Sequence, residues 1–383
     1  MTRPRLLFLS LSSRQFGGGE AYLLNLLDHF RLKSNVFIAC ARENPLMVQR
    51  VTQRGLPVLQ LSLGYRHLVA NTRSLAAWHA QEGFHLIHAH GRRSQFFGAF
   101  LSRRTGLPLV GADLVANLNW EGSAAGIVQN LLAALLNRLL VVPQCDRILV
   151  LCEHMRRESL RWLRVPPDRI ITVYNSVDPD FFKPQAREEA LAQSLGIPPQ
   201  APVIGCVARF VSHKGQRTLI EATARLARNS PVRVLLVGDG PDEADLRRRI
   251  CDLGLEDRFV LMGFPVDLRP YLALMDVVVL PSRSEGLPTA LLQAMSMERP
   301  VIGTDIQGIP ELIRPGENGF LFPPARTDLL EKHLRSLLDN PQARRRMGRA
   351  GRERVLASFA LPVMLEKIET IYHEVLSSRN RPR

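Results

Sequence analysis

The 383-residue sequence lacks the features of several protein classes. Its five cysteines are odd in number, scattered, and without a C-x-x-C pair. This pattern argues against a disulfide framework or a zinc site and favours a reducing compartment. No apolar run is long and clean enough to span a bilayer. The apolar stretch over residues 5–11 is too short for the core of a signal peptide with a cleavage site, so we expect a first β-strand there.

Two common phosphate-binding motifs are also missing. Gly17, Gly18 and Gly19 follow the first expected strand and precede a helical pattern. They match neither G-x-x-x-x-G-K-[ST] nor G-x-G-x-x-G with a following acidic residue. Three glycines allow a phosphate or sugar to approach the backbone closely, while a plain glycine turn is the alternative interpretation.

Acidic residues are scarce relative to basic ones, and the net charge is +14. Residues 1–180 hold 21 Lys and Arg against 12 Asp and Glu, whereas residues 181–383 hold 29 against 24. The excess suits an anionic membrane surface, an acidic glycolipid or nucleic acid, and solvated surface arginines explain it equally well. No aromatic-basic platform or helix-turn-helix pattern is present, so we expect no nucleic-acid binding.

The sequence is rich in short apolar runs that alternate with helical patterns. This alternation predicts an α/β fold with two doubly wound parallel sheets. A proline-rich stretch interrupts the rhythm, so we expect a first domain over residues 1–178, a linker over 179–200, a second domain over 201–358, and a final amphipathic helix and tail over 359–383. The expected strands cover residues 5–11, 35–39, 57–61, 85–89, 108–111, 147–151 and 169–173 in the first half, and 203–208, 232–237, 258–261, 276–280 and 300–303 in the second.

The stretch from Ser282 to Phe320 carries the strongest signal for chemistry. Glu285 follows a buried strand and lies in a polar loop that opens a helix. A carboxylate beside the unpaired N–H groups of a helix start suits a polar, anionic ligand at the carboxyl end of a strand. A second strand and a Gly-Ile-Pro-Glu turn at Gly308 to Glu311 follow closely.

This order of loop, helix, strand and Gly-Ile-Pro-Glu turn resembles the donor-binding motif of retaining family-4 glycosyltransferases with the GT-B fold. The resemblance covers nearly the whole chain. It implies two Rossmann-like domains that face a cleft, with the last helix crossing back to the first domain. It further implies transfer of a hexose-type sugar from a nucleotide-diphosphate sugar to a hydroxyl of a glycan or glycolipid acceptor, with no cofactor and no metal.

The resemblance also assigns roles to individual residues. Glu285 would contact the hydroxyls of the transferred sugar, and His90, after a strand of the first domain, would face that sugar across the cleft; a structural histidine is the alternative for His90. Arg209 and Lys214 would neutralise the diphosphate. The remaining expected donor-binding residues are Gly17 and Gly18 of the glycine loop, Gly286, Leu287 and Thr289 beside Glu285, Gly263, Phe264 and Gln293.

The sequence departs from the family pattern at a few positions. Gln293 stands where the family has a second glutamate that accepts from the nucleotide ribose, so we expect a weaker ribose contact. No histidine follows the next strand, at residues 111–113. Asp178 and Asp180 resemble a metal-binding D-x-D pair, but they lie in a segment that resembles the family's link between domains, so we expect no metal there.

Two further features bear on location and on alternatives. Residues 127–140 form an amphipathic helical pattern, which indicates core packing or, as the lesser possibility, docking at a membrane interface.

We expect a cytoplasmic protein, peripheral on the inner membrane, in bacterial surface polysaccharide or lipopolysaccharide synthesis. A nucleotide-sugar epimerase of the same fold and a catalytically degenerate nucleotide-sugar-binding protein remain the alternatives, the latter because of Gln293.

Overall fold

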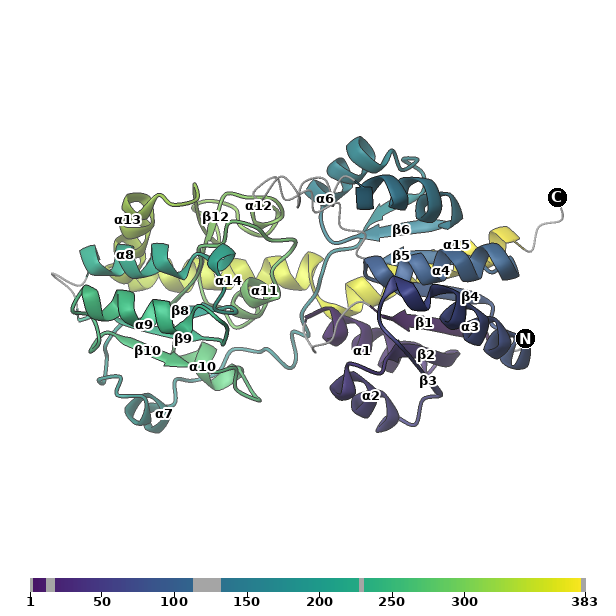
Figure 1. Cartoon of the computed structure of the whole chain (residues 1–383). Coiled ribbons are helices and arrows are strands. Elements are labelled where there is room, and N and C mark those ends of the chain that lie inside the picture. Colours follow the sequence, from purple (N-terminus) through teal and green to yellow (C-terminus); the bar gives the residue numbers. More distant parts are fainter. Residues whose placement is uncertain (1–2, 12–17, 113–131, 227–230, 380–383) are drawn as a thin grey trace. The chain divides into compact units, whose positions relative to one another are not determined.

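The structure is a computed structural model that describes residues 3–11, 18–112, 132–226 and 231–379 (Figure 1). The chain divides into two compact units. The first unit comprises Met1–Tyr174 together with Met364–Arg383, and the second comprises Asn175–Val363.

The first unit is built around a parallel sheet, which has seven strands within the described residues, in the order β3-β2-β1-β4-β5-β6-β7. Its central strands are buried apolar runs, because helices pack on both faces of such a sheet. The strands are β1 (Arg5–Ser10), β2 (Asn35–Ala41), β3 (Val58–Leu61), β4 (Leu86–His90), β5 (Leu109–Ala112), β6 (Arg147–Val150) and β7 (Ile170–Thr172).

The second unit repeats this arrangement with a parallel sheet that has six strands in the described part of the chain, in the order β10-β9-β8-β11-β12-β13. The sequence did not predict β13, a short edge strand that pairs with β12 from Val301↔Gly319 to Thr304↔Phe322. The strands are β8 (Val203–Val207), β9 (Arg233–Val237), β10 (Phe259–Met262), β11 (Val277–Leu280), β12 (Val301–Thr304) and β13 (Gly319–Phe322).

Helices connect successive strands, and local sequence explains several of their ends. Asn44 caps α2 by accepting from the Met47 amide, and Asn340 caps α14 by accepting from Ala343, each with proline at the next position. Gly106 ends α4 in the left-handed region at φ 75°. The helices of the first unit are α1 (Gly18–Phe30), α2 (Pro45–Thr52), α3 (Leu68–Glu82), α4 (Arg92–Thr105), α6 (Glu153–Glu158) and the short turns η1 (Tyr65–His67), η2 (Asn137–Val141), η3 (Val142–Gln144) and η4 (Ser159–Leu163). Those of the second unit are α7 (Glu189–Ser194), η5 (Ser212–Lys214), α8 (Gln216–Leu226), α9 (Glu243–Asp252), α10 (Arg269–Leu274), α11 (Thr289–Ser296), α12 (Ile309–Leu312), α13 (Thr327–Leu338) and α14 (Pro341–Ser358).

The stretch expected to be a linker, residues 179–200, is part of the second unit. It contains α7, whose Ala192 is fully buried. The Ser296 hydroxyl donates to the Phe182 carbonyl at 2.7 Å, so side chains of the unit hold this segment in place. The proline-rich composition signalled the change of unit but not this packing.

The last helix, α15 (Leu361–Arg379), returns the chain to the first unit, which includes everything from Met364 onward. Its Tyr372 hydroxyl lies 2.7 Å from Nδ1 of His88 on β4, and its Glu369 pairs with Lys33 at 2.7 Å. The predicted α/β class with two doubly wound parallel sheets is therefore confirmed. In each sheet the strand order reverses beside the first strand, between β1 and β4 and between β8 and β11. Ligands of such sheets bind outside the carboxyl ends of the strands at these reversal points.

Candidate functional site

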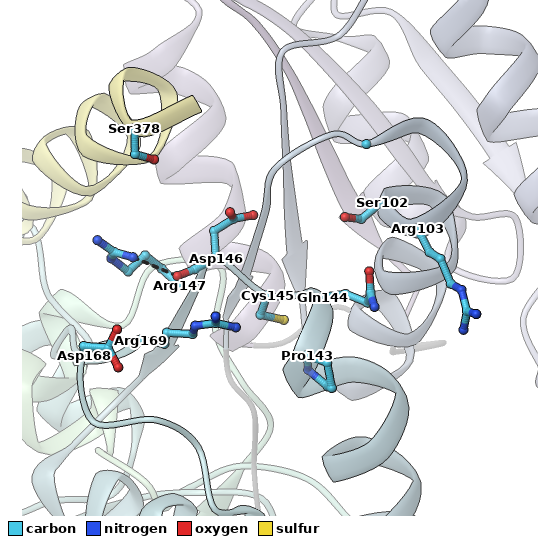
Figure 2. Close-up of a pocket in the computed structure, with 11 residues that line it drawn as sticks. Ser102, Arg103, Pro143, Gln144, Cys145, Asp146, Arg147, Asp168, Arg169 and Ser378 are labelled. Atoms are coloured by element: carbon cyan, nitrogen blue, oxygen red, sulfur yellow. Dashed lines mark hydrogen bonds between the residues drawn. The ribbon is translucent and has the colours of Figure 1, made fainter. Parts of the chain in front are cut away.

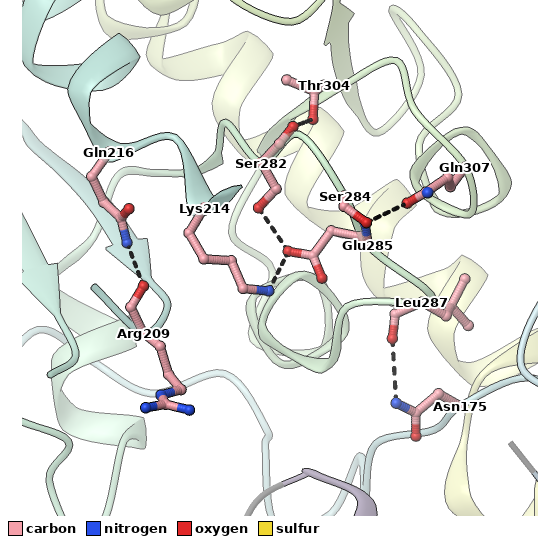
Figure 3. Close-up of polar contacts among 10 residues, drawn as sticks. All are labelled: Asn175, Arg209, Lys214, Gln216, Ser282, Ser284, Glu285, Leu287, Thr304 and Gln307. Atoms are coloured by element: carbon pink, nitrogen blue, oxygen red, sulfur yellow. Dashed lines mark hydrogen bonds and ion pairs between the residues drawn. The ribbon is translucent and has the colours of Figure 1, made fainter. Parts of the chain in front are cut away.

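The sequence-predicted donor residues of the second unit gather at the reversal point of its sheet. Lys214 lies in the loop after β8, and Glu285 lies in the loop after the neighbouring strand β11. Lys214 Nζ donates to Glu285 Oε1 at 2.6 Å, and the Ser282 hydroxyl donates to the same oxygen at 2.7 Å (Figure 3). The side chains of Lys214 and Glu285 are 21% and 9% exposed. Their close contact and partial burial make the charged pair a fixed feature of the site.

The loops after β8 and β11 approach each other closely because of one glycine. Gly215 adopts φ +70°, and a Cβ placed there would lie 2.0 Å from the Pro281 carbonyl oxygen. No side chain fits that space, so glycine is required for the contact. The Arg283 amide donates to the His213 carbonyl at 2.7 Å and ties the same two loops together. The loop geometry that brings Lys214 to Glu285 thus rests on Gly215.

A third loop, after β12, supports Glu285 through residues that the sequence did not single out. The Gln307 side-chain oxygen accepts a hydrogen bond from the Glu285 amide, and the Ser284 hydroxyl lies 3.5 Å from the same oxygen (Figure 3). The Thr304 hydroxyl donates to the Ser282 carbonyl at 2.6 Å. Gln307 holds φ at +41°, a conformation uncommon for a residue other than glycine. Its position directly before the Gly-Ile-Pro-Glu turn was the signal that could have identified it.

Arg209 presents its charge differently from Lys214. Its carbonyl accepts from the Gln216 side chain at 2.8 Å, while its exposed guanidinium extends away from Gln216 and has no acceptor among the described residues (Figure 3). A guanidinium offers five donors in a fixed fork that suits phosphate oxygens. Arg209 is therefore open to an anion in a way that the paired Lys214 is not.

The other predicted donor residues differ in position and accessibility. Leu287 is buried, and its carbonyl accepts from the Asn175 side chain at 3.3 Å. Gln293 lies half-buried on α11, and no hydrogen bond to its side-chain amide occurs among the described residues. Gly263 and Phe264 are exposed after β10, and Gly286 and Thr289 are half-buried beside Glu285. Gly17 lies outside the described residues, while Gly18 begins α1 after β1.

His90 ends β4 at the reversal point of the first unit's sheet. It is buried and stacks on Tyr22 of α1, with 5.2 Å between ring centroids. A Cβ on Gly19 would lie 2.8 Å from His90 Nε2, so glycine keeps the helix start close to the ring. Burial lowers the pKa of His90 to about 4, and burial followed by the effect of His90 lowers the pKa of His88 to about 3. Both imidazoles are therefore neutral near pH 7.

Asp178, which belongs to the D-x-D pair noted in the sequence, stabilises the backbone of its own segment. Its Oδ1 accepts from the backbone amides of Asp180 at 2.9 Å and Phe181 at 3.1 Å, so its carboxylate fixes a local turn. Among the described residues no group of three or more acidic, histidine or cysteine side chains is arranged to hold a metal ion. No helix in that part of the chain has the length and apolar character needed to cross a membrane.

Comparison with known sequence families accounts for both units. The family described as "Glycosyltransferase Family 4" matches residues 16–181, and the family "Glycosyl transferases group 1" matches residues 187–354. Together the two matches span most of the chain. The chain belongs to the family-4 type of glycosyltransferases. Its fold is GT-B, as the resemblance implied.

Several curated proteins resemble this family-4 chain in sequence. The alpha-D-kanosaminyltransferase of Streptomyces kanamyceticus is 31% identical over 61% of this chain and 62% of its own length. The lipopolysaccharide core biosynthesis glycosyltransferase LpsE of Rhizobium meliloti (strain 1021) is 32% identical over 48% of this chain and 52% of its own length. The match thus spans less than two thirds of the length of these relatives.

Solved structures support the GT-B fold over nearly the whole chain. A glycosyltransferase from Rickettsia africae ESF-5 superimposes with a TM-score of 0.86 at 17% identity, covering 98% of this chain and 99% of that one. Anabaena Alr3699/HepE in complex with UDP-glucose gives a TM-score of 0.83 at 21% identity, covering 97% and 99%. At these identities the likeness concerns the fold.

Proposed function

We propose that this family-4 chain is a hexosyltransferase. It transfers a sugar from a nucleotide-diphosphate donor to a hydroxyl of a glycan or lipid-linked acceptor, and it retains the anomeric configuration without a metal ion. The observation that carries the proposal is the Lys214–Glu285 pair, which lies at the reversal point of the second sheet in the same loops as the open guanidinium of Arg209. The UDP-glucose complex of Alr3699/HepE, which shares this fold, supports a nucleotide-sugar donor.

The proposed roles follow from the charges of the site. Arg209 and Lys214 bind the diphosphate and stabilise the charge that develops on it as the sugar departs. When Lys214 pairs with the diphosphate, its ion pair with Glu285 is released. The carboxylate of Glu285 can then accept hydrogen bonds from sugar hydroxyls. Gln307 keeps the Glu285 backbone in place throughout. The neutral His90 is the proposed sugar-facing residue of the first unit.

The acceptor side is proposed from the surface of the first unit. A cavity of about 530 Å³ is lined by the apolar or aromatic residues Tyr65, Phe96, Leu132 and Leu136, and by Arg92, which follows β4. Residues 127–131 of the expected amphipathic helix lie outside the described residues, but four leucines of its remainder are 40–59% exposed, namely Leu132, Leu135, Leu136 and Leu139. Exposed aliphatic side chains beside basic residues suit a lipid-linked acceptor at the cytoplasmic face of an anionic membrane. The LpsE relative supports a setting in surface polysaccharide or lipopolysaccharide synthesis.

A thermal-shift panel of UDP-, GDP-, ADP- and dTDP-sugars tests the donor site. We expect one nucleotide class to raise the melting temperature, because a ligand that binds only the folded state stabilises it, and we expect Arg209→Ala to abolish the shift. Turnover of the identified donor, followed by product analysis with and without EDTA, then tests retention and metal independence. Donor turnover without an acceptor would indicate an epimerase, and binding without any turnover would indicate a degenerate protein.

A further inference from the structure

A polar cavity of about 670 Å³ lies in the first unit (Figure 2). Its walls come from the end of α4, from the residues directly before β6 and β7, and from Ser378 of α15. These are amino ends of strands, whereas His90 stands at the carboxyl end of β4 in the same parallel sheet. The cavity therefore opens at the opposite edge of the sheet from His90.

The lining of this cavity is basic. Arg103, Arg147 and Arg169 contribute three positive charges, and Asp146 and Asp168 contribute two negative ones. Asp146 Oδ2 accepts from the Leu109 amide at 2.9 Å, so this carboxylate serves the first residue of β5. The exposed Asp168 forms no ion pair with any residue that the structure describes.

Arg169 is the residue that indicates a ligand. Its backbone is fixed, because its carbonyl accepts from the Ile148 amide at 2.7 Å and its amide donates to the Pro166 carbonyl at 3.0 Å. Its half-buried side chain extends toward Cys145 (Figure 2). It is close enough to oppose the burial that raises the pKa of the Cys145 thiol to about 12. Within the described residues no oxygen accepts a hydrogen bond from its guanidinium.

Two other half-buried arginines, Arg54 and Arg269, do have acceptors. Arg54, 26% exposed, donates to Asp28 at 2.9 Å, and Arg269, also 26% exposed, donates to Asp267 at 2.7 Å. A guanidinium that is withdrawn from water without an acceptor loses part of its hydration and gains nothing in return. Arg169 combines such a guanidinium with a place in the wall of a cavity, so an acceptor from outside the chain can reach it.

Arg147 lines the same cavity, and two contacts already use part of the hydrogen-bonding capacity of its guanidinium. Its Nη1 donates to the Asp146 carbonyl at 2.9 Å, and its Nη2 lies 3.8 Å from Glu374 of α15. The carbonyl end of the α4 dipole also borders the cavity and disfavours an anion, but Arg103 in the last turn of that helix offsets this effect.

We propose that this cavity binds the phosphate group of a small polar molecule, with Arg169 as the principal contact and Arg147 as the second. Guanidinium groups bind phosphate oxygens through paired hydrogen bonds. The cavity is much larger than a phosphate ion alone, and the polar side chains of Gln144, Ser102 and Ser378 in its lining suit a polar body rather than an aliphatic chain. The inference does not depend on the proposed sugar transfer.

Calorimetric titration of the full chain with glycerol 3-phosphate tests the site. We expect Arg169→Gln to weaken binding about 10- to 100-fold, because one charge-assisted contact is lost. Arg73→Gln removes an exposed charge from α3 and is the matched control, with affinity unchanged. Arg209→Gln, which alters the donor site of the second unit, is also expected to leave this affinity unchanged, and the melting temperature of each variant verifies folding.

The opposite results would overturn the proposal. If no heat of binding appears with the wild-type chain, or if Arg209→Gln abolishes binding while Arg169→Gln does not, the cavity is not a phosphate site. Co-sedimentation with phosphatidylglycerol vesicles then distinguishes the source of the phosphate. Vesicle binding that Arg169→Gln weakens and Arg73→Gln preserves indicates a lipid headgroup, whereas binding of glycerol 3-phosphate without such vesicle binding indicates a soluble ligand.

Discussion

The two units use the same sheet design but equip its reversal point in different ways. In the second unit the loops after β8 and β11 carry a charged pair, Lys214 and Glu285, with the open guanidinium of Arg209 in the same loop as Lys214. In the first unit the end of β4 carries two buried histidines whose pKa values lie far below the ordinary value. The charged pair therefore lies in the unit proposed to hold the anionic donor. The end of β4 in the other unit carries two neutral imidazoles.

Burial explains this difference. The Glu285 carboxylate keeps a cationic partner, Lys214, and one further hydrogen-bond donor, the Ser282 hydroxyl, which makes a partly buried carboxylate tolerable. His88 and His90 are buried beside aromatic rings, among them Tyr22, Phe8 and Tyr372. Burial disfavours the charged imidazolium, so the rings stay neutral.

The largest effect is expected from removing the charge of the second unit's pair. Glu285→Gln keeps the shape of the side chain but takes away the charged acceptor for the transferred sugar. We expect turnover to fall about 10²- to 10³-fold, as for other groups that act on the transition state, while donor affinity changes little because Lys214 is released for the diphosphate. Steady-state kinetics and donor titration check this. Glu317→Gln, an exposed glutamate of the same unit, is the control, and unchanged turnover in Glu285→Gln would remove Glu285 from the mechanism.

The next effect is a loss of stability at acidic pH caused by the buried histidines of the first unit. Their folded-state pKa values of about 3 and about 4 lie below the unfolded value of 6.5, so the unfolded chain binds more protons as pH falls below 6.5. The stability contributed by the neutral rings is full above pH 6.5 and is lost progressively as the pH falls to about 4 for His90 and about 3 for His88. Each histidine contributes a slope of about 1.4 kcal/mol per pH unit in the middle of this window. Urea unfolding between pH 5.5 and 4.5 should show a slope smaller by about that amount in His88→Gln, and equal slopes would mean that His88 is not held neutral.

A smaller loss of stability is expected from Tyr372→Phe. The hydroxyl of Tyr372 and Nδ1 of His88 lie 2.7 Å apart in a buried setting, so the variant leaves the imidazole nitrogen without its partner. We expect the free energy of unfolding to decrease by about 1–3 kcal/mol at pH 7. Tyr65→Phe, at a tyrosine that is 47% exposed, should change it far less. If both variants unfold at the same urea concentration as the wild type, the hydrogen bond does not anchor α15 to β4.

The sequence predicted most strands and the residues of the Lys214–Glu285 pair because these follow local patterns. Buried β-branched runs mark strands, and a carboxylate or cation directly after such a run marks the carboxyl edge of a sheet. The sequence could not predict contacts between distant segments. The bond between Tyr372 and His88 joins residues far apart in the chain, and β13 is four residues whose pairing partner, β12, decides its conformation. Gln307 was missed because its role is to accept a hydrogen bond from the amide of Glu285 on a different loop, and only its place before the Gly-Ile-Pro-Glu turn hinted at it.

Gln307→Ala tests that missed contact. The variant removes the acceptor of the Glu285 amide but leaves the Lys214–Glu285 pair. One lost hydrogen bond is worth about 1 kcal/mol, so we expect turnover to fall about 5- to 10-fold with little change in donor affinity. Gln193→Ala, at an exposed glutamine of α7, is the control for both kinetics and melting temperature. Donor affinity that falls as much as turnover would show that Gln307 binds the donor instead of positioning Glu285.

The smallest effect is expected where the chain departs from its family. Gln293 lies half-buried on α11, and an amide offers one acceptor oxygen where a carboxylate accepts from both hydroxyls of a ribose. Gln293→Glu should therefore tighten donor binding by about 1 kcal/mol, or about fivefold, measured by calorimetry against Gln193→Glu. The substitution also adds a negative charge to the second unit, and repulsion between this charge and the negative diphosphate opposes the gain. Tighter binding would mean that the ribose contact dominates at this position. Unchanged or weaker binding would mean that repulsion between the added carboxylate and the diphosphate cancels or outweighs that contact, and that the neutral amide of Gln293 avoids this repulsion.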